Sequence, residues 1–314
     1  MIGDEFRKLA EQSGIDLIGF FSVEPLKECL PYLIKRHQAG FSTGFEGGEP
    51  EQRIDYLRVF PSAKAGIAIG ISNYQVFEAV VDDRVRGQFA SVSWGEDYHR
   101  VLSRKMNELM EALNDERQKS GALPIQYQVF VDNSPLVDRG SAYRAGLGFF
   151  GKNNCLINHQ LGSFFFIGQI LVDCHIVFEQ PQLVKNGCGN CQRCLDACPN
   201  QALGEGFSLD PSKCISYLTQ KKTLTSDEED RISTYLYGCD ICQNVCPYNQ
   251  QLKQTREEAF LVDGDTASPS LEGILTLTNK VFKSCYGKTA SGWRGKKILV
   301  RNAQLIWKNK KRHD

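Results

Sequence analysis

The chain has 314 residues, long enough for two packed units, with 12 cysteines and a formal net charge of zero from 37 basic and 37 acidic side chains. A hydrophobic share of 41% and a charged share of 24% exclude a disordered chain. The longest mostly apolar stretch, residues 162–172, is too short to cross a bilayer, and the N-terminal residues show no apolar signal region. We therefore expect a cytoplasmic protein with no membrane partner.

The first 185 residues alternate helix-like and strand-like patterns. In the longest helix pattern, which begins at Asp97 as N-cap, Leu102, Met106, Leu109 and Leu113 fall on one face. The patterns predict helices over residues 4–13, 25–38, 97–121 and 135–145, and strands over 15–23, 64–72, 126–132, 155–158 and 163–173. This alternation predicts an α/β domain, a sheet flanked by helices, and leaves open whether the sheet is parallel or mixed.

The rest of the chain divides by composition. Residues 186–250 are rich in cysteine with short helix patterns, and residues 251–314 form a basic segment that is helical around Trp293 and Trp307. We therefore predict an α/β domain over 1–185, a cysteine-rich domain over 186–250 and a basic helical segment over 251–314.

Basic residues are concentrated at the C-terminal end. Between Gly273 and His313 the chain has no Asp or Glu but eleven Lys or Arg residues, which leaves 26 basic against 37 acidic residues elsewhere. They are Lys280, Lys283, Lys288, Arg294, Lys296, Lys297, Arg301, Lys308, Lys310, Lys311 and Arg312. An acidic body with a basic end favours a polyanionic partner. A solvated basic helix that simply ends the chain is the alternative.

Eight of the twelve cysteines lie between residues 188 and 246, and in a reducing compartment such clustering indicates metal. One run has the spacing Cys-x2-Cys-x2-Cys-x3-Cys-Pro of bacterial 4Fe-4S ferredoxins, and the second run repeats it with a stretched first interval. In two-cluster ferredoxins the fourth cysteine of each run binds the other cluster. This rule assigns one cluster to Cys188, Cys191, Cys194 and Cys246, and the other to Cys198, Cys214, Cys239 and Cys242.

A pair of four-cysteine zinc sites is the alternative, but zinc sites usually come as two separated cysteine pairs. The other four cysteines have no partner spacing, and we expect them to be buried small hydrophobic residues. They are Cys29, Cys155, Cys174 and Cys285.

Two other motifs are incomplete. Residues 146–151 fit the dinucleotide pattern GxGxxG but follow a helix pattern rather than a strand, which disfavours a nicotinamide site. Asp173-x-His175 begins a motif by which some proteins bind cobalamin through histidine, but Phe178 stands where that motif has glycine. The radical S-adenosylmethionine triplet Cys-x3-Cys-x2-Cys is absent from the sequence.

Several strings together resemble one family. They are Trp94-Gly-Glu-Asp-Tyr-His99, Val131-Asp-Asn-Ser-Pro135 with Asp138-Arg139, Ala145-Gly-Leu-Gly148, Gly151-Lys-Asn-Asn154, Gly162-Ser-Phe-Phe-Phe166, Cys214-Ile-Ser-Tyr-Leu-Thr-Gln220, Leu236-Tyr-Gly-Cys-Asp240, and Trp293-Arg-Gly295 with Arg301-Asn302. Over residues 5–305 the chain resembles the epoxyqueuosine reductases, cobalamin-dependent iron-sulfur enzymes that complete queuosine synthesis on tRNA. Many members continue into a C-terminal helical-repeat extension, whereas this sequence reaches Asp314.

The resemblance implies a reductive removal of the epoxide oxygen at the wobble position of a tRNA anticodon. Asp132 matches the family's catalytic aspartate, which would protonate the oxygen as the epoxide opens. To be an acid at neutral pH it needs a raised pKa, which burial beneath the corrin and beside Phe130 and Val131 could supply. The plain alternative is an Asx-turn residue at a strand end.

The resemblance also implies cobalamin contacts at Arg53, Asp132, Leu156, Ile167, Ser216 and Asp240. It implies a tRNA contact at Lys222, and the basic segment adds Arg294, Lys296, Lys297 and Arg301 as candidates for binding an anticodon stem-loop. Trp293 beside Arg294 could stack on bases or lie in the core. We expect an external flavodoxin-type or ferredoxin-type electron donor and a monomer.

Two other functions stay open at this point. A corrinoid iron-sulfur reductase of a small molecule, similar to reductive dehalogenases, would use the same cofactors. A non-enzymatic electron carrier would need only the clusters, and some 185 residues of α/β scaffold argue against it.

Overall fold

The computed structural model describes residues 2–78 and 80–311, which form two compact units. The first unit comprises the chain up to Ser72 together with His99–Gly189, and the second comprises Asn73–Tyr98 together with the chain from Asn190 onward. The packing therefore groups the chain differently from the three predicted ranges. Residues 73–98 join the second unit, which also contains the basic range and the cysteine-rich range from residue 190 onward.

The first unit is built on an antiparallel sheet of strand order β1-β2-β7-β4. Its strands are β1 Leu17–Phe21, β2 Ala65–Ser72, β4 Tyr127–Phe130 and β7 Phe165–Val172. A small hairpin pairs β5 Phe149–Phe150 with β6 Leu156–Ile157. The helical elements are α1 Ile2–Gln12, α2 Leu30–Gln38, α3 Pro50–Arg53, η1 Tyr56–Arg58, α4 Tyr98–Lys119 and α5 Asp138–Arg144.

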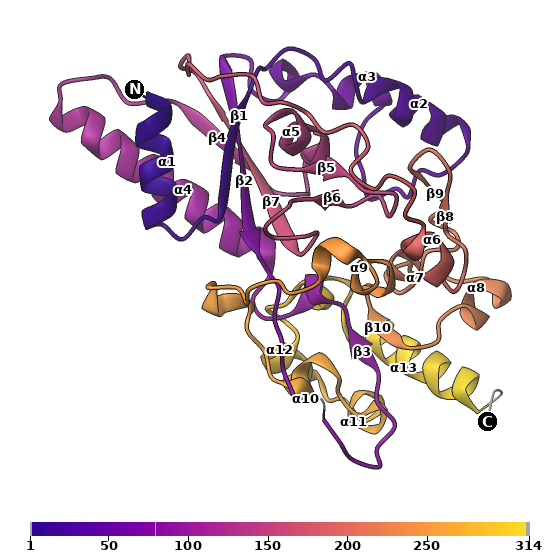
Figure 1. Ribbon diagram of the computed structural model, residues 1–314. Helices are drawn as coiled ribbons and strands as arrows, with labels where there is room; N and C mark the ends of the chain where they lie inside the picture. The colour runs from indigo at the N-terminus through magenta and orange to yellow at the C-terminus, as the bar shows by residue number, and fades with distance from the viewer. Residues whose placement is uncertain (1, 79, 312–314) are drawn as a thin grey trace. The chain divides into compact units, whose positions relative to one another are not determined.

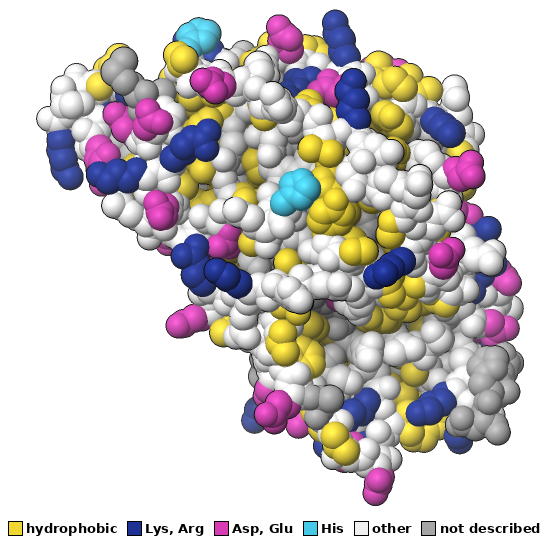
Figure 2. Space-filling view, in the orientation of Figure 1, with side chains coloured by type: hydrophobic (Ala, Val, Ile, Leu, Met, Phe, Trp, Pro, Cys, Tyr) yellow, Lys and Arg dark blue, Asp and Glu magenta, His cyan; other side chains and the backbone are white. Residues whose placement is uncertain are grey.

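Helices cover both faces of this sheet (Figure 1). On one face Phe6 of α1 packs on Phe20 with ring centroids 5.9 Å apart, and Met106 of α4 is fully buried. On the other face the core includes Phe21, Tyr56 and residues of α5. Because strand side chains alternate between faces, Gln169 and Ile167 of β7 point to the α5 side. Figure 2 shows basic and acidic side chains interspersed over the solvent side of α1 and α4.

The second unit has little sheet. Strands β3 Gln88–Phe89 and β10 Tyr235–Tyr237 pair in parallel, and β8 Leu203–Gly204 pairs with β9 Ser208–Leu209. The helices are α6 Arg193–Ala197, α7 Ile215–Leu218, α8 Ser226–Asp230, α9 Ile241–Asn244, α10 Gly264–Ala267, α11 Leu271–Leu275, α12 Asn279–Cys285 and α13 Lys296–Lys310. Single 3-10 turns are η2 Ser91–Ser93, η3 Pro247–Asn249, η4 Glu258–Phe260 and η5 Ala290–Arg294. One core joins β3, β10, α11 and α13.

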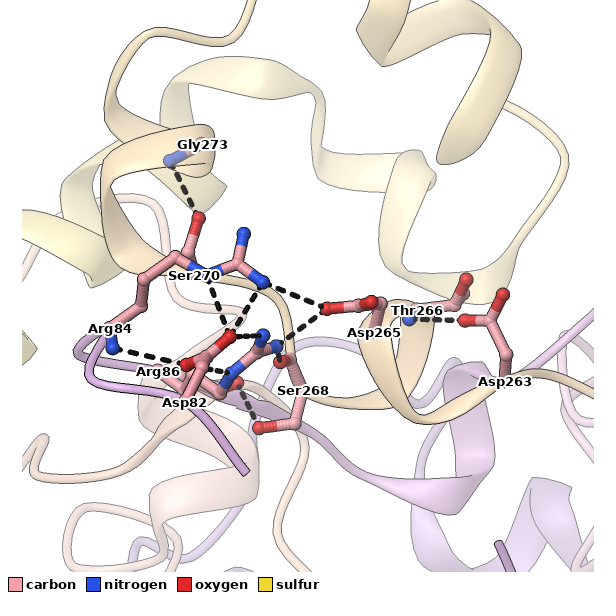
Figure 3. A network of polar contacts seen from close by, with 10 residues as sticks. Asp82, Arg84, Arg86, Asp263, Asp265, Thr266, Ser268, Ser270 and Gly273 are labelled. Carbon is pink, nitrogen blue, oxygen red and sulfur yellow. Dashed lines mark hydrogen bonds and ion pairs between the residues drawn. The ribbon is translucent and has the colours of Figure 1, made fainter. Parts of the chain in front are cut away.

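An ionic network fastens the 73–98 segment within this unit (Figure 3). Asp82 accepts hydrogen bonds from Arg84 and Arg86, and Arg86 reaches Asp265 at 2.8 Å and the carbonyl of Ser268. These contacts hold the pKa of Asp82 below its usual range and raise that of Arg86. Segments some 180 residues apart in sequence are thereby linked.

The predicted elements of the first unit are confirmed, most of them with shorter ends, although α1 begins two residues before the predicted start. Their sheet is antiparallel, whereas the sequence had left a parallel or a mixed sheet open. The predicted strand 126–132 ends at Phe130, and the predicted helix 135–145 is confined to α5, because Pro135 and the turns after Asp132 keep the preceding residues out of a helix. The helix expected from residue 97 begins at Tyr98. No helix among the described residues is both long enough and apolar enough to span a bilayer.

Candidate active site

Asp132 lies on a tight loop between β4 and α5. Its backbone has φ of +52°, and the loop is closed by hydrogen bonds from the N–H of Ser134 to the Asp132 carbonyl and from the N–H of Leu136 to the Ser134 hydroxyl. Left-handed backbone at a residue other than glycine is unusual and is common at functional sites. The loop turns the Asp132 carboxylate away from the sheet and toward His99, whose Nε2 lies 3.6 Å from Oδ2.

The burial expected for Asp132 is not provided by the protein itself. Phe130 and Val131 are each 8% exposed, whereas the Asp132 side chain is 62% exposed. The left-handed turn points the carboxylate outward after the two apolar residues have entered the core. The sequence-based expectation that these neighbours bury Asp132 is therefore wrong.

A second carboxylate lies at the start of α5. Gln169, fully buried on β7, donates a hydrogen bond from Nε2 to Oδ1 of Asp138. Burial, followed by the nearby negative charge of Asp132, raises the pKa of Asp138 to about 7, although Gln169 and the guanidinium groups of Arg139 and Arg53 act in the opposite direction. Asp138 is therefore a group that exchanges protons near neutral pH.

In the described part of this unit, the polar atoms buried without a hydrogen-bond partner include Arg53 Nε, Asn153 Nδ2 and Gln169 Oε1. Buried polar atoms normally have partners, so such atoms need an explanation such as a bound ligand. Arg53 ends α3 and interacts electrostatically with Asp138, and burial lowers its pKa. The two donors, Arg53 Nε and Asn153 Nδ2, suit a ligand that carries amide oxygens.

Leu156 and Ile167 lie on β6 and β7. The Leu156 side chain is 3% exposed and belongs to the core, so only its backbone is available to a ligand, whereas Ile167 is partly exposed beside the same core. The turn before β6 is closed by a hydrogen bond from the N–H of Asn154 to the carbonyl of Gly151. Arg139 donates to the Asn154 carbonyl and so ties this turn to α5.

The two incomplete motifs lack the required context. The glycine string 146–151 runs from the end of α5 into β5, the reverse of the strand-to-helix order of a dinucleotide-binding loop. His175 is exposed in the segment after β7. Among the cysteines outside the runs, Cys29 is buried, but Cys285 is exposed, contrary to expectation, because α12 has no buried residues.

Seven of the eight cysteines of the two runs lie in the second unit, and Cys188 ends up in the first. In the second unit two short helices that carry cysteines pack together, α6 with Cys194 and α9 with Cys242. No disulfide joins the described cysteines. No three His, Cys, Asp or Glu groups in the described ranges are close enough to hold a single metal ion. Cys198 interacts electrostatically with both Cys214 and Cys239, and the predicted crossed assignment places these three in one cluster.

The polypeptide around these cysteines also suits thiolate ligands. The N–H of Ala202 donates to Sγ of Cys198 at 3.3 Å, and hydrogen bonds to cluster sulfurs are one means of setting a cluster's potential. Asp240, between Cys239 and Cys242, is 6% exposed and accepts from the N–H of Ser91 at 2.6 Å and from Gln243 at 2.9 Å. Its carboxylate therefore braces the cysteine loop, and burial raises its pKa.

Ser216 lies on α7, two residues after Cys214, and is partly exposed. Its carbonyl accepts hydrogen bonds from Thr219 Oγ1 at 3.1 Å and Gln220 Nε2 at 2.8 Å. Its side chain has a partly open surface, which keeps it available to a ligand.

The predicted tRNA-contacting residues divide into two kinds. Lys222 and Lys297 are exposed, and Lys296 is partly exposed. Arg301 differs, because its guanidinium donates inward to the carbonyls of Leu218, Lys221 and Lys222 and to Oδ1 of Asn302. It therefore fixes the backbone that carries Lys222 and has few donors left for phosphate. Arg312 of the basic segment lies outside the described residues.

Trp293 is 51% exposed, and the guanidinium carbon of Arg294 lies 3.6 Å from the centre of its ring. The pair thus presents a stacked aromatic and cationic surface rather than a core tryptophan.

Sequence reasoning did not single out Asp138 and Gln169, which lie beside the Asp132 loop. Asp138 was visible only as part of a family string, and Gln169 was hidden inside an apolar strand pattern, where a single polar residue is the available signal.

Comparisons with known proteins agree with this geometry. Residues 53–133 match the family model described as "Epoxyqueuosine reductase QueG, DUF1730", and residues 187–249 match "4Fe-4S double cluster binding domain". An epoxyqueuosine reductase of Lactococcus garvieae is 39% identical over 302 residues, covering 95% of this chain and 84% of the relative. The chain belongs to the epoxyqueuosine reductase family.

Two solved epoxyqueuosine reductases have closely similar folds. One, crystallised with an epoxyqueuosine-modified tRNA-Tyr stem loop, superposes with a TM-score of 0.90 at 34% identity, covering 98% of this chain and 81% of that chain. Another, from Bacillus subtilis, has its catalytic aspartate loop swung out of the active site and gives a TM-score of 0.89 at 33% identity with the same coverage.

In this epoxyqueuosine reductase family member, the first matched range ends one residue after Asp132, and the second contains all eight cysteines of the two runs. The chain therefore carries a double 4Fe-4S cluster domain.

Proposed function

We propose that this chain reduces the epoxide of epoxyqueuosine in tRNA to the alkene of queuosine. The observation that carries the proposal is the match along 98% of the chain to an epoxyqueuosine reductase crystallised with its modified tRNA stem loop. The presence of Asp132 on an outward-pointing, left-handed loop supports it.

The residues present fit the implied cofactors. Eight cysteines, with Cys198 interacting across to Cys214 and Cys239, would hold the two clusters. The unpartnered atoms Arg53 Nε and Asn153 Nδ2 can donate to the amide side chains of a corrin. When bound, cobalamin supplies a nucleophilic low-potential metal centre, and the clusters supply its electrons singly.

The chain's own residues supply position and protons. Asp132 would donate a proton from Oδ2 to the oxygen that leaves the epoxide, with His99 holding the carboxyl group in place. Leu156, Ile167, Ser216 and Asp240 would contribute backbone and apolar contacts to the corrin. The Asp240 carboxylate is occupied by Ser91 and Gln243, so it would not serve as a proton donor.

The second unit would bind the anticodon stem-loop. Lys222, Lys296 and Lys297 would contact phosphates, and the stacked Trp293 and Arg294 would meet unpaired bases. We further propose that the protein works as a monomer in the cytoplasm and takes electrons from a flavodoxin-type or ferredoxin-type protein.

Anaerobic incubation of the iron-reconstituted protein with cobalamin, dithionite and epoxyqueuosine-containing tRNA, followed by nucleoside mass spectrometry, tests the proposal. We expect loss of one oxygen atom only when cobalamin and tRNA are present. Reduction of a small epoxide or halide with no reduction of the tRNA would refute it.

A further inference from the structure

The Asp138 and Gln169 pair remains unexplained by the proposed roles. Asp138 begins α5 and Gln169 sits in the middle of β7, on the face of the sheet that packs against α5. Nothing about the packing of two apolar faces requires a carboxyl group here, and placing one next to a second carboxylate costs free energy. The charged groups that face Asp138 in the described structure are Asp132, Arg139 and Arg53.

We propose that Asp138, held by Gln169, stores the second proton that the reduction consumes and passes it to Asp132. This inference rests on the proposed function. Asp138 is a positioning residue in this scheme, because it supplies Asp132 and does not touch the substrate.

The stoichiometry of the reaction creates the need for such a pair. Removing the epoxide oxygen breaks both of its C–O bonds, forms one C=C bond, consumes two electrons from the external reductant and two protons, and releases water. Asp132 gives the first proton to the oxygen and becomes a carboxylate. The second proton passes from Asp138 to Asp132 and then to the leaving hydroxide, so both carboxyl groups end ionised and are reprotonated by solvent.

Gln169 can serve Asp138 in both protonation states. Its Nε2 donates to the carboxylate, as the structure shows, and its Oε1 has no partner and can accept from the carboxylic acid after rotation of the amide. A buried amide that offers both a donor and an acceptor holds a proton on its neighbour without being left unsatisfied. The raised pKa of Asp138, about 7, is what such a reservoir requires near neutral pH.

The first test measures stability and needs no turnover. The pKa of Asp138 lies above that of an aspartate in an unfolded chain, so the folded protein binds an extra proton between about pH 4 and pH 7 and loses stability as pH rises through that window. We expect D138N to gain melting temperature relative to the wild-type full chain between these pH values and to keep a constant advantage above about pH 7.

A matched control and a second variant sharpen this test. D115N makes the same change at an exposed position on α4 and should follow the wild-type curve at every pH. Q169L removes the donor that stabilises the Asp138 carboxylate, so the pKa of Asp138 should rise further. In this variant the fall in melting temperature with pH should therefore continue to a higher pH than in the wild type. Parallel curves for wild type and D138N would overturn the proposal, because no proton would then be held.

The second test uses single-turnover reduction of epoxyqueuosine in tRNA. We expect the wild-type rate to fall as pH rises through about 7, and D138N to be about tenfold or more slower at pH 6 and flat over the same range. If the wild type reduces the tRNA and D138N keeps the wild-type pH profile, the proton-holding role of Asp138 is refuted while the proposed function stands. If no tRNA is reduced although the stability curves diverge, the proposed function fails while the held proton stands.

Discussion

Replacing Asn302 with alanine should destabilise the second unit strongly. Asn302 is fully buried on α13, and its Nδ2 donates at 2.8 Å to the carbonyls of Thr219 and Leu236, while its Oδ1 accepts from Arg301. N302A leaves two buried carbonyl oxygens without donors, and each costs about 1–3 kcal/mol. We therefore expect a loss of about 2–6 kcal/mol, or roughly 4 °C or more in melting temperature.

The assay follows from where the tryptophans lie. All three, Trp94, Trp293 and Trp307, belong to the second unit, so intrinsic fluorescence reports the melting of that unit. The matched control is Q304A, an exposed position on the same helix, which should stay within about 0.5 kcal/mol of wild type.

A second variant separates hydrogen bonding from packing. N302L fills the space of the asparagine but cannot satisfy the two carbonyls, so it should be as unstable as N302A. The reasoning is refuted if N302L has the melting temperature of the wild type, or if N302A has that of Q304A. Either outcome would mean that the two carbonyls find other donors.

Three further predictions concern the cofactors and the substrate. D132N should lose epoxide reduction while retaining wild-type cobalamin and iron content, which absorption spectra and iron assay report; a turnover rate within tenfold of wild type would exclude Asp132 as the proton donor. C198S and C214S should each lose the same cluster, so the double variant should retain about four irons per chain; complete loss in the double variant alone would contradict the crossed assignment. K297Q should lower the slope of log tRNA affinity against log salt concentration by about one, because one phosphate contact is lost. K308Q should change this slope less, because Lys308 faces Glu229 at 3.7 Å. Equal slopes for the two variants would count against α13 as the tRNA-binding surface.

The sequence predicted most elements of the first unit, because strand 65–72 is an apolar run buried at every residue and the helix over 98–119 buries one long apolar face. Strand order was not predictable, since alternation shows that a strand is buried and does not identify its partner. The placement of residues 73–98 was missed for a similar reason: β3 has only two residues, and its partner β10 is about 150 residues away.

The site residues divide in the same manner. Cysteine spacing is local information, so the double 4Fe-4S cluster domain could be predicted from the sequence, and the crossed assignment of its cysteines stays a prediction. The direction of a side chain is not local information. Arg301 counts as one basic residue in the sequence, but only the fold shows that it faces backbone carbonyls. Only the fold likewise shows that Asp138 is half-buried against Gln169, whereas Asp132 is exposed.

The second unit is assembled from two separate stretches of the chain, and this affects its folding during synthesis on the ribosome. The 73–98 segment is made early, yet β3 must wait for β10, and Arg86 must wait for Asp265, which emerges about 180 residues later. During that interval Phe89 and its neighbours have no core to enter. At the usual pace of ~5–20 residues per second, the segment is exposed for roughly 10–40 s. We expect chaperone dependence in vivo to be centred on this segment and to be relieved once the chain passes α11.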